Sequence, residues 1–496
     1  MKKITLIFAF SIINLTVFLS HATAQNANEA HTSQSVKWGE IYTKEDNNSI
    51  YDYIGSIDQS QYYSFGYNTI GFSISRFNRL GFMRVENQKV TMYNNDYIQI
   101  PKYSLIETFT TGQDIVILYS EENSDEERNE IKCVRVDKNT LKEKSRQRLI
   151  SFPKGSKDIS DVRVLHSKDR SKILIACLNR NRKTNEGSFT LNVYNQDLEK
   201  QYTQSYIPKQ EGDISLLDVC IDNDGSVFLL SAVRYNDKKA PNRAKLSVAR
   251  LQSEDQVEQM ISEDVNVVDA KFLPLEKNKA LIAINSGSEC KVITYDFEKE
   301  DVLNTLSTTY TKSKEKTYWT IDDILRLENG NCVVVVKDAY RLLDYSQTNT
   351  VCYDRNLYTF CVNPQQGAVV YAQLISKAIA YMHSYDVKKG QFECPFYFTK
   401  GNDFYVLYNA DKGDDDLCGE VFIKTNITLP QQTRDVVANL IKIGQDGKPI
   451  LKNLFFYKDD KALFSQNLTS IFSDGSVQVG RMGKKDVEFG LLQLDK

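Results

Sequence analysis

The sequence predicts an all-β fold built from one repeated four-stranded unit, and three observations support this prediction. Tyrosine and phenylalanine, which favour β-strands, are abundant among the 496 residues, with 28 and 24 copies. Short apolar runs return along the chain at intervals. Dipeptides of the Asn-Gly and Asp-Gly type, which suit tight hairpin turns, stand directly before several of these runs. With 41% hydrophobic and 26% charged residues, the composition is typical of a globular protein rather than a disordered one.

The apolar runs are expected to form the second strand of each unit. They are rich in Val, Ile, Leu, Phe and Tyr, and continuous runs this short are typical of strands covered on both faces. They occupy residues 114–120, 172–178, 227–233, 280–284, 332–336, 404–408 and 477–479. Successive starts are 52 to 73 residues apart, so the widest spacings require insertions between strands.

A first strand and a tight turn precede several of the runs. The turns at 222–225, 328–330 and 473–475 all end in glycine, which supplies the positive φ that a short hairpin needs. The same criterion gives eight first strands, near Tyr51, Ser104, Asp161, Leu216, Val267, Ile324, Phe392 and Leu468.

Third and fourth strands follow each run. Residues 133–136 and 440–443 are examples of third strands that end in a turn, and 146–152 and 202–207 are examples of fourth strands. Four antiparallel strands in a repeat of about fifty residues is the pattern of one β-propeller blade. The sequence therefore predicts a ring of blades.

At the level of fold the chain resembles the β-propeller superfamily, over essentially all of residues 25–496. Its overall sequence pattern is similar to that of uncharacterised exported propellers of Gram-negative bacteria. The resemblance rests on repeat length and turn positions, because no Trp-Asp dipeptide ends the units as it does in WD repeats. It implies a fold and no chemistry.

Ring closure is expected to involve both ends of the chain. The eighth unit lacks a fourth strand after residues 489–494, and Val36 to Thr43 shows the partial alternation of apolar and polar residues that the other fourth strands show. We expect this segment to complete the eighth blade, since closure removes an exposed strand edge. A ring of seven blades, with one unit miscounted, is the alternative.

Residues 1–24 have the three parts of a secretory signal peptide: a basic start, an apolar run over 4–19, and a small-x-small cleavage signal at 22–24. A membrane helix is the competing interpretation, but the run is shorter than the ~20 residues a span requires and polar residues interrupt it. We therefore expect an exported protein, periplasmic or secreted, cleaved before Gln25. Residues 25–496 would then form a single propeller domain that does not span the membrane.

The charge balance argues against nucleic acid as a partner. Removal of residues 1–24 takes away two lysines and no acid, which leaves 60 basic residues of 62 against 65 acidic ones. No basic stretch of the kind that follows a phosphate backbone is present. The expected partner is a protein or glycan of the cell envelope or exterior, and the protein is expected to be a monomer.

The functional residues are expected in long connections on one face of the ring. In a four-stranded blade the turns between strands one and two and between three and four share a face, and here they are short. The connections between strands two and three, and between blades, share the other face and are long, at 121–130, 179–187, 234–243, 311–319, 376–391 and 409–434. Long connections without regular structure are often functional.

Four residues in these connections are candidates for ligand binding. Tyr318 and Trp319 belong to one long loop, and Tyr381 and His383 to another. Aromatic rings stack on sugars and peptides, although packing at the rim explains them equally well. The loops 376–391 and 409–434 come from neighbouring blades and are expected to form one wall.

The sequence contains few residue patterns that could form a catalytic or metal-binding site. Within the repeats only His166 and His383 are histidines, so neither a Ser-His-Asp site nor a histidine zinc site is predicted. The acidic loop around Asp411, Asp414, Asp415 and Asp416 does not have the EF-hand spacing and is interpreted as a solvated charge run. Nine cysteines without a C-x-x-C pair indicate buried thiols rather than redox or zinc chemistry. No cofactor, metal or catalytic residue is therefore assigned.

These observations predict a non-catalytic, exported propeller that binds a protein, peptide or glycan on its long-loop face. The alternative is a propeller hydrolase or lyase that acts on a polysaccharide or peptide through carboxylates in the central channel. Convergence of charged side chains at the channel would favour the enzyme.

Overall fold

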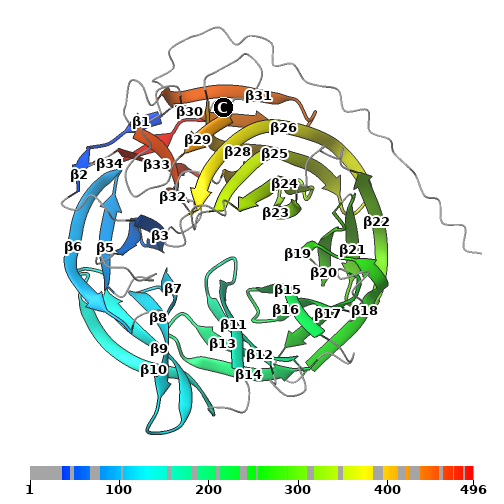
Figure 1. Cartoon of the computed structure of the whole chain (residues 1–496), viewed down its shortest axis with the longest axis horizontal. Coiled ribbons are helices and arrows are strands. Elements are labelled where there is room, and N and C mark those ends of the chain that lie inside the picture. The colour runs from blue at the N-terminus through cyan, green and yellow to red at the C-terminus, as the bar shows by residue number, and fades with distance from the viewer. Residues whose placement is uncertain are drawn as a thin grey trace, which may run out of the picture.

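A computed structural model of the chain shows eight four-stranded antiparallel blades arranged in a ring, an eight-bladed β-propeller (Figure 1). The structure describes residues 36–44, 50–66, 79–101, 104–153, 158–180, 187–207, 213–234, 243–252, 255–276, 278–287, 289–309, 318–343, 350–383, 395–411, 420–423, 436–456, 462–472, 474–483 and 486–494. The predicted fold class and the count of eight blades are confirmed. The expected signal peptide and residues 414–416 lie outside the described residues.

Blades one to four follow one another along the chain. Blade one contains β3 (Ile50–Ile57), β4 (Ser60–Gly66), β5 (Arg79–Glu86) and β6 (Lys89–Gln99). Blade two contains β7 (Leu105–Thr110), β8 (Asp114–Asn123), β9 (Arg128–Asp137) and β10 (Glu143–Pro153). Blade three contains β11 (Asp158–His166), β12 (Lys172–Arg180), β13 (Gly187–Asn195) and β14 (Lys200–Tyr206). Blade four contains β15 (Asp213–Ile221), β16 (Val227–Arg234), β17 (Arg243–Gln252) and β18 (Asp255–Asn266).

Blades five to eight complete the ring. Blade five contains β19 (Asp269–Leu275), β20 (Lys279–Asn285), β21 (Glu289–Asp296) and β22 (Asp301–Thr309). Blade six contains β23 (Tyr318–Arg326), β24 (Cys332–Leu343), β25 (Thr350–Asn363) and β26 (Ala368–His383). Blade seven contains β27 (Phe396–Lys400), β28 (Asp403–Asp411), β30 (Val436–Ile443) and β31 (Pro449–Phe456). Blade eight contains β32 (Ala462–Ile471), β33 (Val477–Gly483), β34 (Asp486–Leu492) and β1 (Val36–Trp38).

The expected closing strand is confirmed. β1 pairs antiparallel with β34, with Val36 opposite Leu492 and Trp38 opposite Gly490. β2 (Tyr42–Thr43) continues the same edge and pairs with Val487 and Asp486. Blade eight is thus assembled from both ends of the described chain, and Val36 is 4% exposed within it.

The core is divided among the interfaces between blades. Second and third strands carry side chains that are buried on both faces, as in β16 and β30. The buried side chains fall into eight clusters in the described part of the chain, one at each junction of neighbouring blades. This explains the continuous apolar runs, because a blade inside the ring has another blade on each face.

The turns have the predicted backbone. Gly225, Gly330, Gly447 and Gly475 all have φ between 75° and 90°, the region open to glycine and costly for other residues. These glycines lie in first-to-second or third-to-fourth turns, as the sequence indicated. First strands surround the centre of the ring, and fourth strands such as β6, β10 and β14 form its perimeter (Figure 1).

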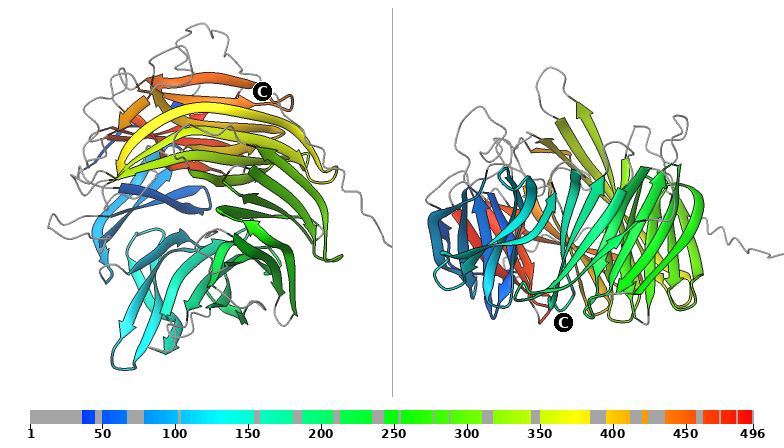
Figure 2. Two further views of the ribbon diagram at one scale, coloured as in Figure 1. Left: turned by 45° about the vertical axis from the view of Figure 1, so that its right-hand side comes forward. Right: turned by 90° about the horizontal axis from the view of Figure 1, so that it is seen from below.

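Blade six is longer than its neighbours on the face of the second-to-third connections. β24, β25 and β26 have 12, 14 and 16 residues, and their outer parts rise above the ring (Figure 2, right). Register shifts between Asp338 and Ala339 and between Asp354 and Asn356 mark where this extension begins. Such bulges bend a strand out of the plane of its sheet.

Candidate functional site

Five charged residues occupy one level of the channel wall, on the first strands of five consecutive blades. The second strand of each of these blades has a reference residue near its start: Ile115, Ile173, Val227, Ala280 or Cys332. Each of the five charged residues pairs with the residue three positions after that reference, so the five occupy equivalent positions around the ring. We call this row the channel belt: Glu107, Arg163, Asp218, Lys271 and Asp323. Their charges alternate in sign from blade two to blade six.

The backbone explains how charged residues are accommodated on inner strands. A register shift lies directly before Glu107, Asp218 and Asp323. An extra residue in one strand re-aims the next side chain and leaves a backbone N–H outside the ladder. In all three cases the carboxyl accepts the N–H of the following residue, at 3.4 Å for Glu107, 2.9 Å for Asp218 and 2.8 Å for Asp323.

Two inner-strand carboxylates also connect neighbouring blades. Asp218 Oδ2 accepts a hydrogen bond from the backbone N–H of Phe272 at 2.8 Å, which joins blade four to blade five. Asp269, on β19, accepts from Ala270 with Oδ1 and from Ile321 in blade six with Oδ2, each at 2.9 Å. Both oxygens of each carboxylate are therefore occupied by backbone donors.

Burial dominates the electrostatics of the acids. It raises the pKa of Asp218, Asp269 and Asp323 above the usual value of a carboxyl. The Lys271 charge acts in the opposite direction on all three, and Arg163 does so on Asp218. Lys271 is therefore the cation that these acids share.

Two members of the belt have unused hydrogen-bonding capacity. Asp323 accepts a bond with Oδ1 only, from Ile324. In the part of the chain that the structure describes, Lys271 Nζ has neither a hydrogen-bond nor an ion-pair partner. Arg163, by contrast, donates to the carbonyls of Leu216 and Leu217, at 3.1 and 3.3 Å.

A separate charge pair lies beside the belt, between blades six and seven. Asp322 pairs with Lys337 at 3.3 Å and accepts a hydrogen bond from the Tyr397 hydroxyl at 2.7 Å. Lys337 is 7% exposed. This group neutralises itself and joins two blades, so we treat it as structural.

The extension of blade six is the second candidate site. We call it the crest and define it as residues 339–343, 350–355, 376–383 and β29 (Glu420–Ile423). β29 comes from the second-to-third connection of blade seven and pairs in parallel with Ala378–Tyr381 of β26. The described parts of the predicted loops 376–391 and 409–434 therefore meet as paired strands.

The crest is rich in apolar and aromatic residue types. Its register aligns one cross-strand row of Tyr340, Tyr353, Ala380 and Phe422, and a second row of Leu342, Val351 and Met382. Because positions two apart on a strand share a face of the sheet, both rows belong to the same face. The register thus brings apolar residue types from three strands of blade six and from β29 together on one face of the crest.

The structure separates the four residues expected to bind a ligand. Tyr381 and His383 belong to β26 and lie in the crest, so the expectation of an irregular loop at 376–383 is wrong. Tyr318 and Trp319 begin β23, and the expectation of a loop is wrong there too. Trp319 is 3% exposed and meets Tyr358 edge-to-face at 4.7 Å, in the core between blades five and six.

Other predicted features are placed as follows. His166 lies edge-to-face with Phe109, and burial lowers its pKa to about 4, as suits a packed residue. Asp411 ends β28. The hairpin β8–β9 takes up most of the expected loop at 121–130. Six described cysteines are free thiols, Cys361 among them.

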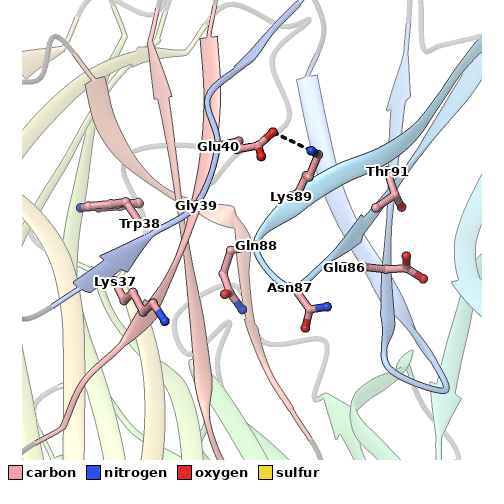
Figure 3. Close-up of a pocket in the computed structure, with 9 residues that line it drawn as sticks. All are labelled: Lys37, Trp38, Gly39, Glu40, Glu86, Asn87, Gln88, Lys89 and Thr91. Atoms are coloured by element: carbon pink, nitrogen blue, oxygen red, sulfur yellow. Dashed lines mark ion pairs between the residues drawn. The ribbon is translucent and has the colours of Figure 1, made fainter.

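A polar hollow lies at the seam between the closing strand and blade one (Figure 3). It has a volume of about 740 Å³ and is lined by Lys37, Trp38, Gly39, Glu40, Glu86, Asn87, Gln88, Lys89 and Thr91. Lys89 pairs with Glu40 across it at 2.8 Å. The indole of Trp38 is stacked under Arg481, 4.0 Å from ring centre to guanidinium carbon, and edge-on to Phe455. We infer a structural seam rather than a ligand site.

Sequence reasoning missed the channel belt. With 65 acids in the chain, no single one stands out. One signal was available: Asp218, Lys271 and Asp323 stand at the same distance before Val227, Ala280 and Cys332, where the second strands begin. Within the described ranges no group of three or more His, Cys, Asp or Glu residues is arranged to hold a metal ion. None of the described segments forms a helix long and apolar enough to cross a membrane.

Comparisons with known proteins identify no family and give only distant resemblances among solved structures. No family model matches the chain, and no curated protein matches it. Among solved structures, the chain is similar to the Dos1 propeller, with 11% identity and a TM-score of 0.46 over 93% of this chain and 97% of that one. It is also similar to the polysaccharide lyase Uly1, with 10% identity and a TM-score of 0.42 over 92% and 100%. The propeller domain of the Trilobed protease from Pyrococcus furiosus is similar too, with 12% identity and a TM-score of 0.37 over 83% of this chain and 99% of that one. At such identities the likeness concerns the fold alone.

Proposed function

We propose that this propeller is an exported, non-catalytic binding protein, and that the crest holds its ligand, a protein, peptide or glycan. The observation that carries the proposal is the crest itself. Two neighbouring blades contribute strands to it, and it extends the strands of blade six beyond the level of the ring (Figure 2). Rows of apolar residue types on one face of such an extension are the composition expected of a surface that contacts another molecule.

The state of the channel acids supports binding over catalysis. Carboxylates do converge on the channel, which is the pattern that would favour a hydrolase or lyase. However, both oxygens of Asp218 and of Asp269 accept backbone N–H groups. A carboxylate that holds two blades together is poorly placed to exchange protons with a substrate.

The test removes the β24–β25 part of the crest, which includes Tyr340, Leu342, Val351 and Tyr353, and keeps the ring. In the crest-truncated variant, residues 340–353 are replaced by Asn-Gly between Ala339 and Asp354, which are paired in the ladder. A matched control shortens the β8–β9 hairpin on the same face, with Asn-Gly in place of residues 122–129 between Glu121 and Glu130. Surface hairpins tolerate such changes, so both variants should fold.

The readout is capture of partners by the mature protein from an extract of its native cell envelope, quantified by mass spectrometry. The proposal expects partners that the intact protein and the hairpin control retain and the crest-truncated variant loses. Retention of every partner by the crest-truncated variant would show that binding does not depend on the β24–β25 part of the crest and would contradict the proposal.

The alternative, a hydrolase or lyase acting on polysaccharide or peptide, has one specific observation in its favour. Burial raises the pKa of Asp323, one of whose oxygens is not engaged, and a raised carboxyl pKa is the direction that general-acid catalysis requires. An assay with polysaccharide and peptide libraries decides between the two. Turnover that disappears in Asp323→Asn and survives crest truncation would favour the enzyme.

Export is part of the proposal and rests on the signal-peptide pattern of residues 1–24. Protein isolated from the native organism should begin at Gln25 by amino-terminal sequencing and fractionate with the periplasm or the medium. Intact residues 1–24 on a cytoplasmic protein would contradict this part.

A further inference from the structure

We propose that Lys271 and Asp323 form a binding site in the channel for a small zwitterion, of the class of an α-amino acid or a short free peptide. The site does not rest on the function proposed for the crest. It lies on the inner strands of blades five and six, at neighbouring positions of the channel belt.

The first argument is the unused hydrogen-bonding capacity of the two groups. Lys271 Nζ, an ammonium with three donors, is without a partner in the described structure, and Asp323 uses one oxygen. Both side chains belong to half-buried residues, where an unmatched charge is costly. They do not form an ion pair with each other, since no N···O distance of 4.0 Å or less joins them. A ligand that gives an oxygen to Lys271 and an N–H to Asp323 would match both.

The second argument is that other charged groups on the inner strands around the pair are engaged. Asp218 and Asp269 bind backbone N–H groups, and Arg163 binds two carbonyls. These groups fix the positions of the inner strands on either side of Lys271. The open pair is therefore held on ordered strands, which favours a defined site over a mobile surface pair.

The third argument is charge, which selects the class of ligand. Lys271 acts electrostatically on three carboxylates, those of Asp218, Asp269 and Asp323, and Arg163 acts on the first of them. The neighbourhood is thus net negative when all are ionised. A phosphate or other dianion would be repelled, whereas a molecule with both a carboxylate and an ammonium would meet both signs.

The test is calorimetric titration of the mature protein at neutral pH with glycine and with glycylglycine. N-acetylglycinamide, which lacks both charges, and inorganic phosphate serve as comparison ligands. We expect at least one zwitterion to bind, and Lys271→Met and Asp323→Asn each to weaken it at least tenfold, on the order of one lost charged hydrogen bond. Lys271→Arg, which keeps the charge, should bind more tightly than Lys271→Met.

The matched control is Lys291→Met on β21 of the same blade, another half-buried lysine, which should leave binding unchanged. Circular dichroism and the melting temperature establish that each variant folds. Tighter binding of phosphate than of either zwitterion would overturn the proposal. So would unchanged affinity in folded Lys271→Met, or the absence of any zwitterion binding up to about 10 mM.

Discussion

Asp218 and Asp269 illustrate how single residues hold this ring together. Each carboxylate spans the gap between two inner strands and accepts a backbone N–H from the next blade. Asn409 makes a similar connection with an amide: it donates to the Phe464 carbonyl at 2.8 Å and accepts from the Phe464 N–H at 3.1 Å. Buried polar side chains that resemble catalytic candidates therefore stabilise the contacts between neighbouring blades.

The carboxamide substitutions distinguish these connections from the open residue of the belt. In Asp218→Asn and Asp269→Asn, an NH₂ group would face a backbone N–H, so each variant should lose about 1.5–3 kcal/mol of unfolding free energy. In Asp323→Asn the amide oxygen can still accept the Ile324 N–H, so stability should be equal or higher. Denaturant unfolding at neutral pH measures the difference. Equal losses at all three positions would refute the distinction.

The pH dependence of Asp323 has a definite sign. Burial raises the pKa of Asp323 in the folded protein above its unfolded value, so the folded state binds the proton more tightly. The contribution of Asp323 to stability is therefore fully present below the unfolded pKa of about 3.9 and is lost as the pH rises through the folded pKa.

Asp323→Asn removes this titration. Its stability advantage over the natural protein should be largest at neutral pH and should shrink as the pH falls toward about 4. Denaturant midpoints for both proteins across this range measure the gap. A gap that is constant with pH, or one that widens on acidification, would contradict the raised pKa.

At the scale of elements, the seam between β1 and the β5–β6 turn is a close contact of two backbones. A Cβ on Gly39 would overlap the carbonyl oxygen of Gln88. Gly39 also donates its N–H to Phe489 at 2.8 Å, so the closing strand cannot shift without losing a ladder bond. Glycine at this position allows the closing strand to lie against blade one.

Gly39→Ala should therefore lower the unfolding free energy by about 1–3 kcal/mol, the usual cost of forcing atoms into a filled space. Gly112→Ala is the control, because the Cβ there would meet the end of the flexible Gln196 side chain. Its effect should stay within about 0.5 kcal/mol. Chemical denaturation measures the unfolding free energy of both variants. Equal losses would mean that the backbones at the seam move apart at little cost, which would contradict the close contact.

How far the sequence predicted the elements depended on the signal each one carries. Second strands are recognisable from the sequence, because apolar runs such as 227–233 must be covered on both faces. A glycine such as Gly225 or Gly330 also marks the turn before them. First strands have weaker patterns, so Trp319 was assigned to a loop although it is the second residue of β23. The crest depends on bulges near Ala339 and Arg355 and on pairing with β29, which no local pattern indicates. Predicting the channel belt from the sequence would have required the strand register of five blades at once.

At the scale of the whole molecule, closure of the ring depends on a segment distant in sequence from the blade it completes. Val36 is buried in the cluster between blades seven and eight, and Trp38 packs beside it. Gln61 of blade one donates to Ser470 of blade eight at 2.6 Å, and Tyr63 donates to the Leu468 carbonyl at 3.2 Å, inside the neighbouring junction. The described ring thus has buried contacts at every junction.

Deletion of residues 25–44 should destabilise the protein far more than the loss of an ordinary tail, because it exposes the edge of β34 and opens a core cluster. Deletion of residues 25–34, which leaves β1 in place, is the control and should change little. The melting temperature measures both. Equal melting temperatures for the two deletions would show that β1 does not close the ring.

The central claim is that the crest, and neither the short-turn face nor the channel, holds the principal ligand. Hydrogen–deuterium exchange locates this directly, with the mature protein compared free and bound to the partner that the intact protein captures. The account predicts protection on binding within residues 339–343, 350–355, 376–383 and 420–423. Protection confined to the short turns near Asp224 and Asn329, or to the inner strands, would contradict it.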